Sequence, residues 1–422
     1  MIKTYDVVTI GSGPAGLAAA LELQRCGVTH VVIEREARSG GILKQCIHDG
    51  FGLHRFKERL TGPEYAERFL RLAMERGITI LNSTFVTKIK RVEQGFLLTL
   101  VNSQSGVFKI QVKAIILANG CRERTNKQIN IHGTRPSGIY TAGAAQYMIN
   151  IEGYLPCKRC VILGSGDIGL IMARRLTLEG AEVLGVYEAK STPSGLTRNV
   201  SQCLDDFDIP LHLQKTVTEV YGQDKLEGVK IQSVDERMRP IRGTEERVAC
   251  DGLILSVGLI PENELANALD VPMDRHTQGP VVDQNMMSMV DGLFSCGNAL
   301  HVNDLVDYVS ESAEIAARQA AAYAKAEGSQ RNLMEVTYDD AKLLYVVPQR
   351  IDRSHGDNVV IYFRSREDTT EKVLTIRHHG KVLLERAYKR LKPPEMERIE
   401  LDINELSDKD GNLVLELRDQ DG

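Results

Sequence analysis

The sequence has no long uninterrupted apolar run. None of its windows reaches the roughly 18 consecutive apolar residues that a membrane-spanning helix needs. Its N-terminal stretch carries Asp6 and a cluster of glycines among the apolar residues, which the apolar region of a secretory signal would not tolerate well. We therefore expect a cytoplasmic protein with no signal peptide and no membrane span.

The sequence also lacks a charge excess and a cysteine framework. Its 52 Lys and Arg residues against 57 Asp and Glu residues leave a net charge of −5, and neither sign gathers in a long run. This balance gives no indication of a nucleic-acid or anionic-membrane partner. The eight cysteines are scattered along a chain of 422 residues, which favours reduced thiols over a disulfide framework. A chain of this length is expected to form two or three domains.

A glycine-rich turn near the N-terminus has the spacing of a dinucleotide-binding site. It joins a strand expected at 6–10 to a helix expected at 18–26, and another strand is expected at 31–34. The first glycine permits a tight turn, the second lets the backbone approach a pyrophosphate, and the third allows close packing of helix on strand. A carboxylate at the end of the second strand can accept hydrogen bonds from ribose hydroxyls. The residues of this first site are Gly11, Gly13, Pro14, Ala15, Gly16 and Glu34.

The same pattern returns in the middle of the chain. A strand at 160–163, a helix at 170–179 and a strand at 183–188 surround a second glycine-rich turn. A carboxylate at the end of the last strand suits a free 2′-hydroxyl and would repel a 2′-phosphate, so we expect NAD rather than NADP. Two such sites indicate one cofactor that is held permanently and one that exchanges, as in a flavin reductase. The residues of this second site are Gly164, Gly166, Asp167, Ile168, Gly169 and Glu188.

With both turns placed, residues 1–330 resemble the two-dinucleotide-binding flavoproteins, the superfamily of thioredoxin reductase and glutathione reductase. Segments 114–120, 251–258 and 292–298 agree with that resemblance. It implies an α/β fold of two Rossmann-like domains, in which an NAD domain at 155–265 is inserted into an FAD domain at 1–125 and 280–330. The further contacts that it implies are Gly41, Val86, Ala118, Gly120, Gly297 and Asn298 for FAD, and Gly258 for NAD.

Two details qualify the FAD site. The superfamily usually has Asp where this chain has Asn298, and an amide can still hydrogen-bond a ribityl hydroxyl. A helix from about 310 to 325 is implied to direct its N-terminus at the flavin, where its dipole would stabilise the anionic reduced form. Plain amphipathic packing is the alternative for that helix.

The last part of the chain has a different pattern. From about residue 335, short alternating runs at 359–363, 373–376, 382–384 and 399–403 are separated by turns. We expect a small β-rich, sandwich-like domain at 335–422.

Segments 41–52 and 60–66 resemble more closely the flavoprotein subunits of dye-linked amino-acid, opine and glycerol-3-phosphate-type dehydrogenase complexes. This resemblance implies two partners, of which one is a second flavoprotein dehydrogenase subunit, and the other is a small cysteine-bearing subunit. The chain would then exchange electrons between NAD and that complex. The substrate stays open among glycerol 3-phosphate, a hydroxy acid and an amino acid.

The cysteines leave an alternative open. Disulfide reductases need two nearby cysteines beside the flavin, and this chain lacks such a pair at the expected places. Cys46 stands where a single redox thiol could act, or it is a packed thiol near the flavin. Cys157 and Cys160 have redox spacing but precede the strand of the second site, and we interpret them as structural; no metal site is expected.

Three hypotheses follow. The chain is the electron-transfer subunit of a multi-subunit dehydrogenase, a stand-alone NADH-dependent flavin reductase or oxidase that uses Cys46, or a non-catalytic nucleotide-binding scaffold whose working surface is the β-rich tail.

Overall fold

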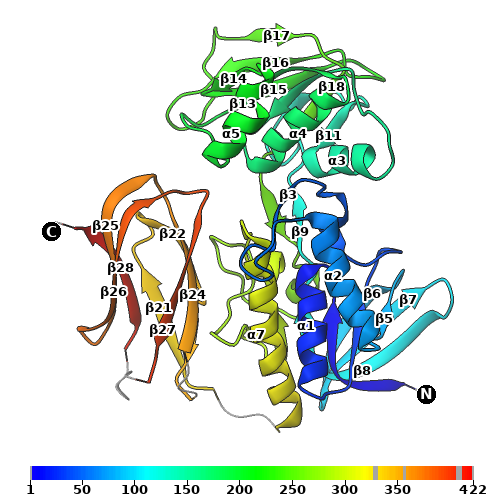
Figure 1. Ribbon diagram of the computed structural model, residues 1–422, viewed down its shortest axis with the longest axis vertical. Coiled ribbons are helices and arrows are strands. Elements are labelled where there is room, and N and C mark those ends of the chain that lie inside the picture. Colours follow the sequence, from blue (N-terminus) through cyan, green and yellow to red (C-terminus); the bar gives the residue numbers. More distant parts are fainter. Residues whose placement is uncertain (1, 327–330, 355–357, 405–410, 421–422) are drawn as a thin grey trace. The chain divides into compact units, whose positions relative to one another are not determined.

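The computed structural model describes residues 2–326, 331–354, 358–404 and 411–420 (Figure 1). The chain forms two compact units, residues 1–121 with 261–422, and residues 122–260. It passes between them in two short paired strands, β9 (Cys121–Glu123) and β19 (Leu259–Pro261). Among the described residues, no helix combines the length and the apolar character that crossing a membrane requires.

The first unit is built on a seven-stranded sheet in the order β5-β2-β1-β8-β7-β6, with β20 paired to β8. The strands β1, β2, β5 and β20 run parallel to their neighbours, while β6, β7 and β8 form an antiparallel meander. Val7 and Val8 of β1 point to opposite faces and both are buried, which is why this strand is an apolar run. The strands are β1 (Lys3–Ile10), β2 (His30–Ile33), β5 (Ile80–Leu81), β6 (Phe85–Val92), β7 (Gly95–Asn102), β8 (Gly106–Leu117) and β20 (Leu293–Ser295).

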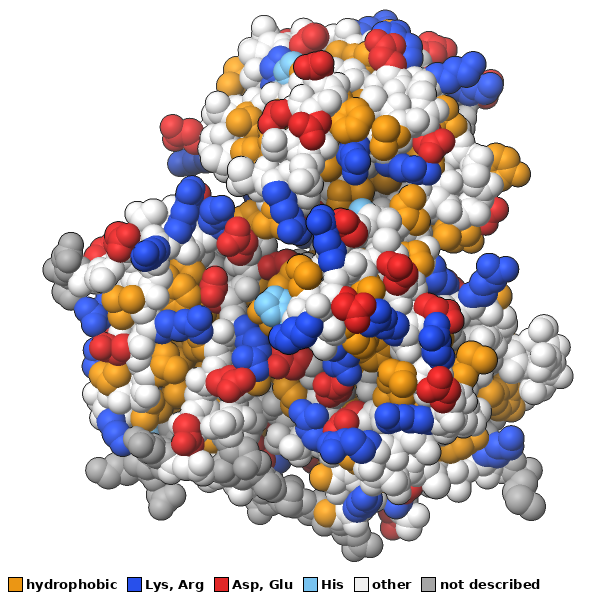
Figure 2. Space-filling model, viewed as in Figure 1, with side chains coloured by type: hydrophobic (Ala, Val, Ile, Leu, Met, Phe, Trp, Pro, Cys, Tyr) orange, Lys and Arg blue, Asp and Glu red, His pale blue; other side chains and the backbone are white. Residues whose placement is uncertain are grey.

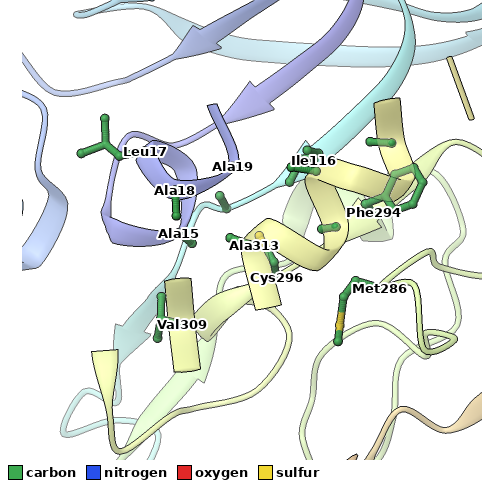
Figure 3. Close-up of a cluster of buried hydrophobic side chains, with 14 of the residues drawn as sticks. Ala15, Leu17, Ala18, Ala19, Ile116, Met286, Phe294, Cys296, Val309 and Ala313 are labelled. Atoms are coloured by element: carbon green, nitrogen blue, oxygen red, sulfur yellow. The ribbon is translucent and has the colours of Figure 1, made fainter. Parts of the chain in front are cut away.

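Two helices of this unit pack closely on each other, α1 (Pro14–Arg25) and α7 (Val306–Lys325) (Figure 1). Figure 3 shows why they can approach, because the side chains in their contact include the small Ala15, Ala19 and Ala313, all buried. Small side chains let helix backbones come close while the surrounding apolar side chains still exclude water. This packing fixes the start of α1, where the first glycine turn lies.

The helix α2 (Gly62–Glu75) begins with the capping box that the sequence indicates. The Thr61 hydroxyl accepts from the Glu64 amide at 3.4 Å, and the Glu64 carboxylate accepts from the Thr61 amide at 2.7 Å. Short elements complete this part of the unit: η1 (Gly41–Gln45), β3 (Asp49–Phe51), β4 (Leu60–Thr61), α6 (Glu264–Asn267) and η3 (Gly297–Ala299).

The second unit has a five-stranded parallel sheet in the order β11-β18-β12-β13-β14 and a smaller sheet in the order β10-β15-β16-β17. Its helices are α3 (Ala142–Asn150), α4 (Asp167–Leu178), α5 (Thr197–Cys203) and η2 (Asp205–Phe207). Its strands are β10 (His132–Gly133), β11 (Ile139–Thr141), β12 (Arg159–Leu163), β13 (Glu182–Glu188), β14 (Leu211–Leu213), β15 (Lys215–Tyr221), β16 (Gly228–Ser233), β17 (Glu246–Val248) and β18 (Gly252–Leu255).

The C-terminal part of the first unit pairs its strands in two sheets, β23-β21-β28-β25-β26 and β22-β24-β27. Side chains of both sheets share one core, as a sandwich requires. The three-stranded sheet is buried on its other face too, since Tyr345 and Tyr362 join the core that contains α7. The strands are β21 (Leu333–Tyr338), β22 (Leu343–Val347), β23 (Arg350–Asp352), β24 (Asn358–Ser365), β25 (Thr369–His378), β26 (Lys381–Leu391), β27 (Met396–Asp402) and β28 (Leu413–Asp419).

The structure confirms the α/β class, and the tail contains each strand that its alternating pattern predicts. The helices α1, α4 and α7 begin earlier than predicted. The first turns of α1 and α4 contain the last glycine of each glycine-rich turn rather than an apolar stripe, and α7 begins at Val306. The strand β11 and the helix α3, which the sequence patterns left unassigned, lie in the second unit, where β11 pairs with β18. The residue limits given for the three domains stay predictions.

On the face shown in Figure 2, acidic and basic side chains are interspersed.

Candidate functional site

In the first glycine turn, packing and backbone conformation within the protein require the outer two glycines. Gly11 has a φ of 104°, and a Cβ there would lie 2.4 Å from the carbonyl oxygen of Ala118. A Cβ on Gly16 would lie 1.8 Å from the carbonyl oxygen of Gly11. The turn and the close approach of α1 to β1 and β8 therefore exclude any side chain at these positions.

The second glycine turn repeats this arrangement. Gly164 has a φ of 96°, and a Cβ there would lie 2.0 Å from the carbonyl oxygen of Ser256. A Cβ on Gly169 would lie 2.5 Å from the carbonyl oxygen of Gly164. Each turn connects the end of a central parallel strand to the first residue of a helix, at Pro14 in one unit and Asp167 in the other.

The middle glycine of each turn has no such requirement. The nearest atom to a Cβ on Gly13 is the Cα of Gly41 at 3.8 Å, and the nearest to a Cβ on Gly166 is the Oγ of Ser256 at 3.7 Å. Both residues have extended backbone angles that any residue adopts, and each is the N-cap of its helix. Packing within the protein would accept a Cβ at both positions, whereas the close approach of a pyrophosphate to the helix N-terminus would require glycine there.

A buried glutamate follows each turn at the predicted position. Glu34 is 6% exposed, and its carboxylate accepts hydrogen bonds from the amide of Ser12 at 2.8 Å, from the hydroxyl of Ser12 at 2.6 Å and from the amide of Glu36 at 2.8 Å. Glu188 is also 6% exposed and accepts from the amide of Ser165 at 3.1 Å and from its hydroxyl at 2.6 Å. Each carboxylate is thus held beside its own turn.

The sequence patterns did not reveal the two serines that hold these glutamates. Ser12 and Ser165 are fully buried and occupy the same place in the two turns. That repeated position was the available signal, because a spacer between two glycines has no need to be the same residue twice unless its side chain has a partner.

Several predicted first-site residues lie against the turn. Gly41 has a φ of 59°, and its Cβ would lie 2.8 Å from the Cα of Gly13. The Cβ of a side chain on Gly297 would lie 3.0 Å from the Cβ of Ala15. Gly120 follows β8 with a φ of 73°, and a Cβ there would have no neighbouring atom within 4 Å.

The contacts that the structure gives for Val86 and Asn298 are with residues outside the glycine turn. Val86 lies in β6 opposite Leu100, shortly after the point where the amide of Thr84 donates to the carbonyl oxygen of Glu34 at 2.8 Å. The side chain of Asn298 has protein partners, since its Oδ1 accepts from the Asn303 amide at 3.0 Å and its Nδ2 lies 3.6 Å from the Cys121 sulfur.

Two orphaned acceptors belong to the same part of the unit. The Asn119 Oδ1, next to Ala118, and the Asp307 Oδ1, in the first turn of α7, are buried without a hydrogen-bond partner among the described residues. The other oxygen of Asp307 accepts from the His54 amide at 3.1 Å. A ligand with hydroxyl or amide groups that bound here could donate hydrogen bonds to both acceptors.

In the second unit, the predicted Ile168 lies in the first turn of α4, and the predicted Gly258 follows β18. Gly258 has a φ of 98° and its carbonyl oxygen accepts from the Arg124 amide at 3.1 Å. Ile168 is partly buried and packs against the core of this unit. The Asp167 carboxylate accepts from the Leu196 amide at 2.8 Å and from the Asn199 side chain at 2.7 Å.

The environment of Cys46 favours a packed thiol over a redox thiol. Cys46 is 5% exposed, and its sulfur donates to the Ile42 carbonyl oxygen at 3.4 Å. Burial raises the pKa of this thiol to about 12. Because the thiolate is the reactive form, a thiol with that pKa is unreactive at neutral pH.

The Cys157 and Cys160 pair has a structural setting. Both side chains are buried at the start of β12, and a hydrogen bond with Cys157, together with burial, raises the pKa of the Cys160 thiol. Among the described residues, no group of three or more His, Cys, Asp or Glu side chains is arranged to hold a metal ion.

The two turns, their held carboxylates and the orphaned acceptors fit two dinucleotides, and comparison with known proteins agrees. The family model described as pyridine nucleotide-disulphide oxidoreductase matches residues 5–320. The chain belongs to this family. It is an oxidoreductase that uses FAD and a pyridine nucleotide, with the two-Rossmann-domain fold of the family.

The named relatives are of two kinds, namely subunits of an oxidase or a synthase, and thioredoxin reductases. The chain is 24% identical to an opine oxidase subunit of Agrobacterium tumefaciens over 76% of its own length and 66% of the relative, and 28% identical to hydrogen cyanide synthase subunit HcnB of Pseudomonas protegens over 63% and 59%. It therefore spans less than two thirds of these two relatives. It is 25% identical to thioredoxin reductase of Treponema pallidum over 76% of this chain and 98% of that protein.

Solved structures agree on the fold. Thioredoxin reductase from T. acidophilum matches with a TM-score of 0.62 and 23% identity, over 77% of this chain and all of that chain. The bacillithiol disulfide reductase Bdr from Bacillus cereus matches with a TM-score of 0.62 and 17% identity, over 76% of this chain and 99% of that chain.

Proposed function

We propose that the first site holds FAD, that the second site holds NAD(H), and that the chain is the electron-transfer subunit of a multi-subunit dehydrogenase. The flavin, when bound, supplies the group that accepts or returns a hydride at the nicotinamide. The protein supplies positions and electrostatics, so we assign no side chain as an acid or a base.

The observation that carries this proposal is that packing within the protein does not require glycine at the two middle positions, Gly13 and Gly166. The outer glycines of each turn are explained by packing within the protein, whereas these two are not. Each lies at a helix N-terminus, where backbone amides and the helix dipole attract phosphate. One chain therefore has two separate places at which a dinucleotide backbone fits.

In the first site, we propose that Glu34 binds the adenosine ribose and that Gly41 and Gly297, which pack against the turn and the start of α1, lie beside the cofactor. The N-terminal turn of α7 adds a favourable dipole toward a reduced, anionic flavin. The unpartnered Asn119 and Asp307 oxygens would accept hydrogen bonds from hydroxyl or imide groups of the cofactor.

In the second site, we propose that Glu188 selects NAD over NADP. Its carboxylate is buried and held beside the turn, so it would face the adenosine ribose. A free 2′-hydroxyl can donate to it, whereas a 2′-phosphate would place two anions in contact.

The assignment as a subunit rests on two supports. Two of the relatives, from opine oxidase and from hydrogen cyanide synthase, are themselves named as subunits. The thiol of the loop after Glu34, Cys46, is buried with a raised pKa and so is poorly suited to pass electrons onward within this chain. We propose a second flavoprotein dehydrogenase and a small cysteine-bearing subunit as the partners.

The first test is a visible spectrum of the purified chain followed by anaerobic addition of NADH. We expect a yellow protein that NADH bleaches. A yellow protein that dithionite bleaches and NADH does not would contradict the second site, and a colourless protein that FAD does not restore would contradict the first.

The subunit proposal needs a separate test. An affinity-tagged chain purified from its native host should bring down two further proteins, one of them yellow. The isolated chain should reduce dyes with NADH yet oxidise no amino acid, hydroxy acid or glycerol 3-phosphate. Oxidation of such a substrate by the isolated chain would show that it is self-contained.

A further inference from the structure

The two glutamates differ in one hydrogen bond. In addition to the two bonds from Ser165, Glu188 accepts from the Lys190 amide at 3.1 Å and from the Ser194 hydroxyl at 3.1 Å. Glu34 has the bonds from its serine and from a following amide, and among the described residues no side chain later in the chain gives it a bond like that of Ser194.

The segment that carries Ser194 is itself fastened to the second turn. The Ser194 amide donates to the Ser165 hydroxyl at 2.9 Å, and the Leu196 amide donates to Asp167 at 2.8 Å. A Cβ on Gly195 would lie 2.9 Å from the carbonyl oxygen of Ser165, so the segment passes directly over the turn. The Ser194 hydroxyl is therefore held where it meets Glu188.

The two sites also differ in what they must distinguish. FAD always has a free 2′-hydroxyl on its adenosine, whereas nicotinamide dinucleotides occur with a 2′-hydroxyl or a 2′-phosphate. A carboxylate that can rotate away leaves room for the phosphate. The additional hydrogen bond thus occurs at the site that has to distinguish NAD from NADP.

We propose that Ser194 is a positioning residue for nucleotide specificity. Its bond fixes the Oε2 of Glu188, so that Oε1, which has one amide donor, keeps an acceptor position directed to a ribose hydroxyl. The carboxylate then stays in place against a 2′-phosphate. This inference rests on the proposed binding of a nicotinamide dinucleotide at the second site.

The test is calorimetric titration of the oxidised protein with NAD⁺ and with NADP⁺, neither of which reduces the flavin. For Ser194→Ala we expect the ratio of the NADP⁺ Kd to the NAD⁺ Kd to fall by about threefold to tenfold, the order expected for the net contribution of one intramolecular hydrogen bond. Ser194→Thr keeps the hydroxyl and should retain the ratio of the unmodified chain. Ser191→Ala, at an exposed residue of the same segment, is the matched control and should not change it.

Each other outcome has a distinct meaning. An unchanged ratio in Ser194→Ala, or an equal fall in Ser191→Ala, overturns the role of Ser194 while leaving the proposed function standing. If Ser194→Ala does not fold, Ser194→Cys keeps the side-chain volume with a weaker donor and has the same expected fall in ratio. An unmodified chain that binds neither nucleotide would instead overturn the proposed function.

Discussion

Replacing the middle glycine of the second turn should separate binding from folding. In Gly166→Ala, the new Cβ would meet the Ser256 Oγ at 3.7 Å, an ordinary contact, and the backbone is extended. We expect the free energy of unfolding to change by about 1 kcal/mol or less. The methyl group would occupy the space needed by the pyrophosphate, so the Kd for NAD⁺ should rise at least about tenfold, or about 1.4 kcal/mol.

The outer glycine provides the contrast. Gly164→Ala places a Cβ 2.0 Å from the Ser256 carbonyl oxygen at a φ of 96°. The left-handed backbone alone costs an alanine about 1 to 2 kcal/mol, and the overlap with backbone adds to this. We expect this variant to lower the melting temperature clearly or to prevent folding.

The assay combines thermal melting with calorimetric titration of NAD⁺ for both variants and the unmodified chain. Gly166→Ala should melt within a few degrees of the unmodified chain and bind NAD⁺ weakly, with its flavin spectrum unchanged. If Gly166→Ala bound NAD⁺ as the unmodified chain does, the reasoning that places a pyrophosphate against Gly166 would be refuted. An equal loss of stability in both variants would refute the packing argument.

Three further predictions use other parts of the first unit. Cys46→Ser should keep NADH-dye reductase activity within about twofold, since a thiol whose pKa is raised to about 12 forms little thiolate at neutral pH, and a loss of activity beyond tenfold would restore the redox role. Burial, with the charge of a nearby arginine, lowers the pKa of His301 to about 3, so the unfolded chain binds a proton that the folded chain does not between about pH 3 and 6.5. This residue should therefore lower the free energy of unfolding as the pH falls below about 6.5, by up to about 1.4 kcal/mol per pH unit. In urea melts at pH 5 and pH 7, the free energy of unfolding of His301→Phe should differ less between the two pH values than that of the unmodified chain. Arg398→Met removes the paired bonds to Glu311, at 2.7 and 2.9 Å, that join the tail to α7, and should lower the free energy of unfolding by about 1 to 2 kcal/mol. The matched Arg390→Met, in an exposed pair within the tail, should leave the free energy of unfolding nearly unchanged. Equal effects of the two variants in urea melts would show that the contact with α7 adds no more stability than an exposed pair does.

Local sequence patterns were sufficient for the parts of the site that depend on backbone. The glycines of each turn follow from the geometry of a tight strand-to-helix connection, and the glutamates follow from the length of one βαβ unit. The capping box at Thr61 and the tail strands were also predictable, because caps and strand alternation are local features.

Other features depended on residues far apart in the chain. The burial of Cys46 and its raised pKa follow from packing beneath α2, where a Cβ on Gly62 would lie 2.8 Å from the Cβ of Cys46. Spacing alone left both a redox thiol and a packed thiol open at Cys46. The bond from Ser194 to Glu188 is likewise invisible in the sequence, because it depends on how the following segment returns over the turn.

The sequence by itself determined that this chain has two dinucleotide turns, an α/β core and a β-rich tail. Those features are repeated, short-range patterns whose geometry is set by glycine conformations and by strand and helix periodicity. Only the tertiary structure decided at which positions packing requires a glycine and at which it would accept a Cβ, which carboxylates are held and by how many donors, and whether the Cys46 thiol is buried. These properties depend on the distance between groups that the fold brings together, and that distance is a consequence of packing rather than of local pattern.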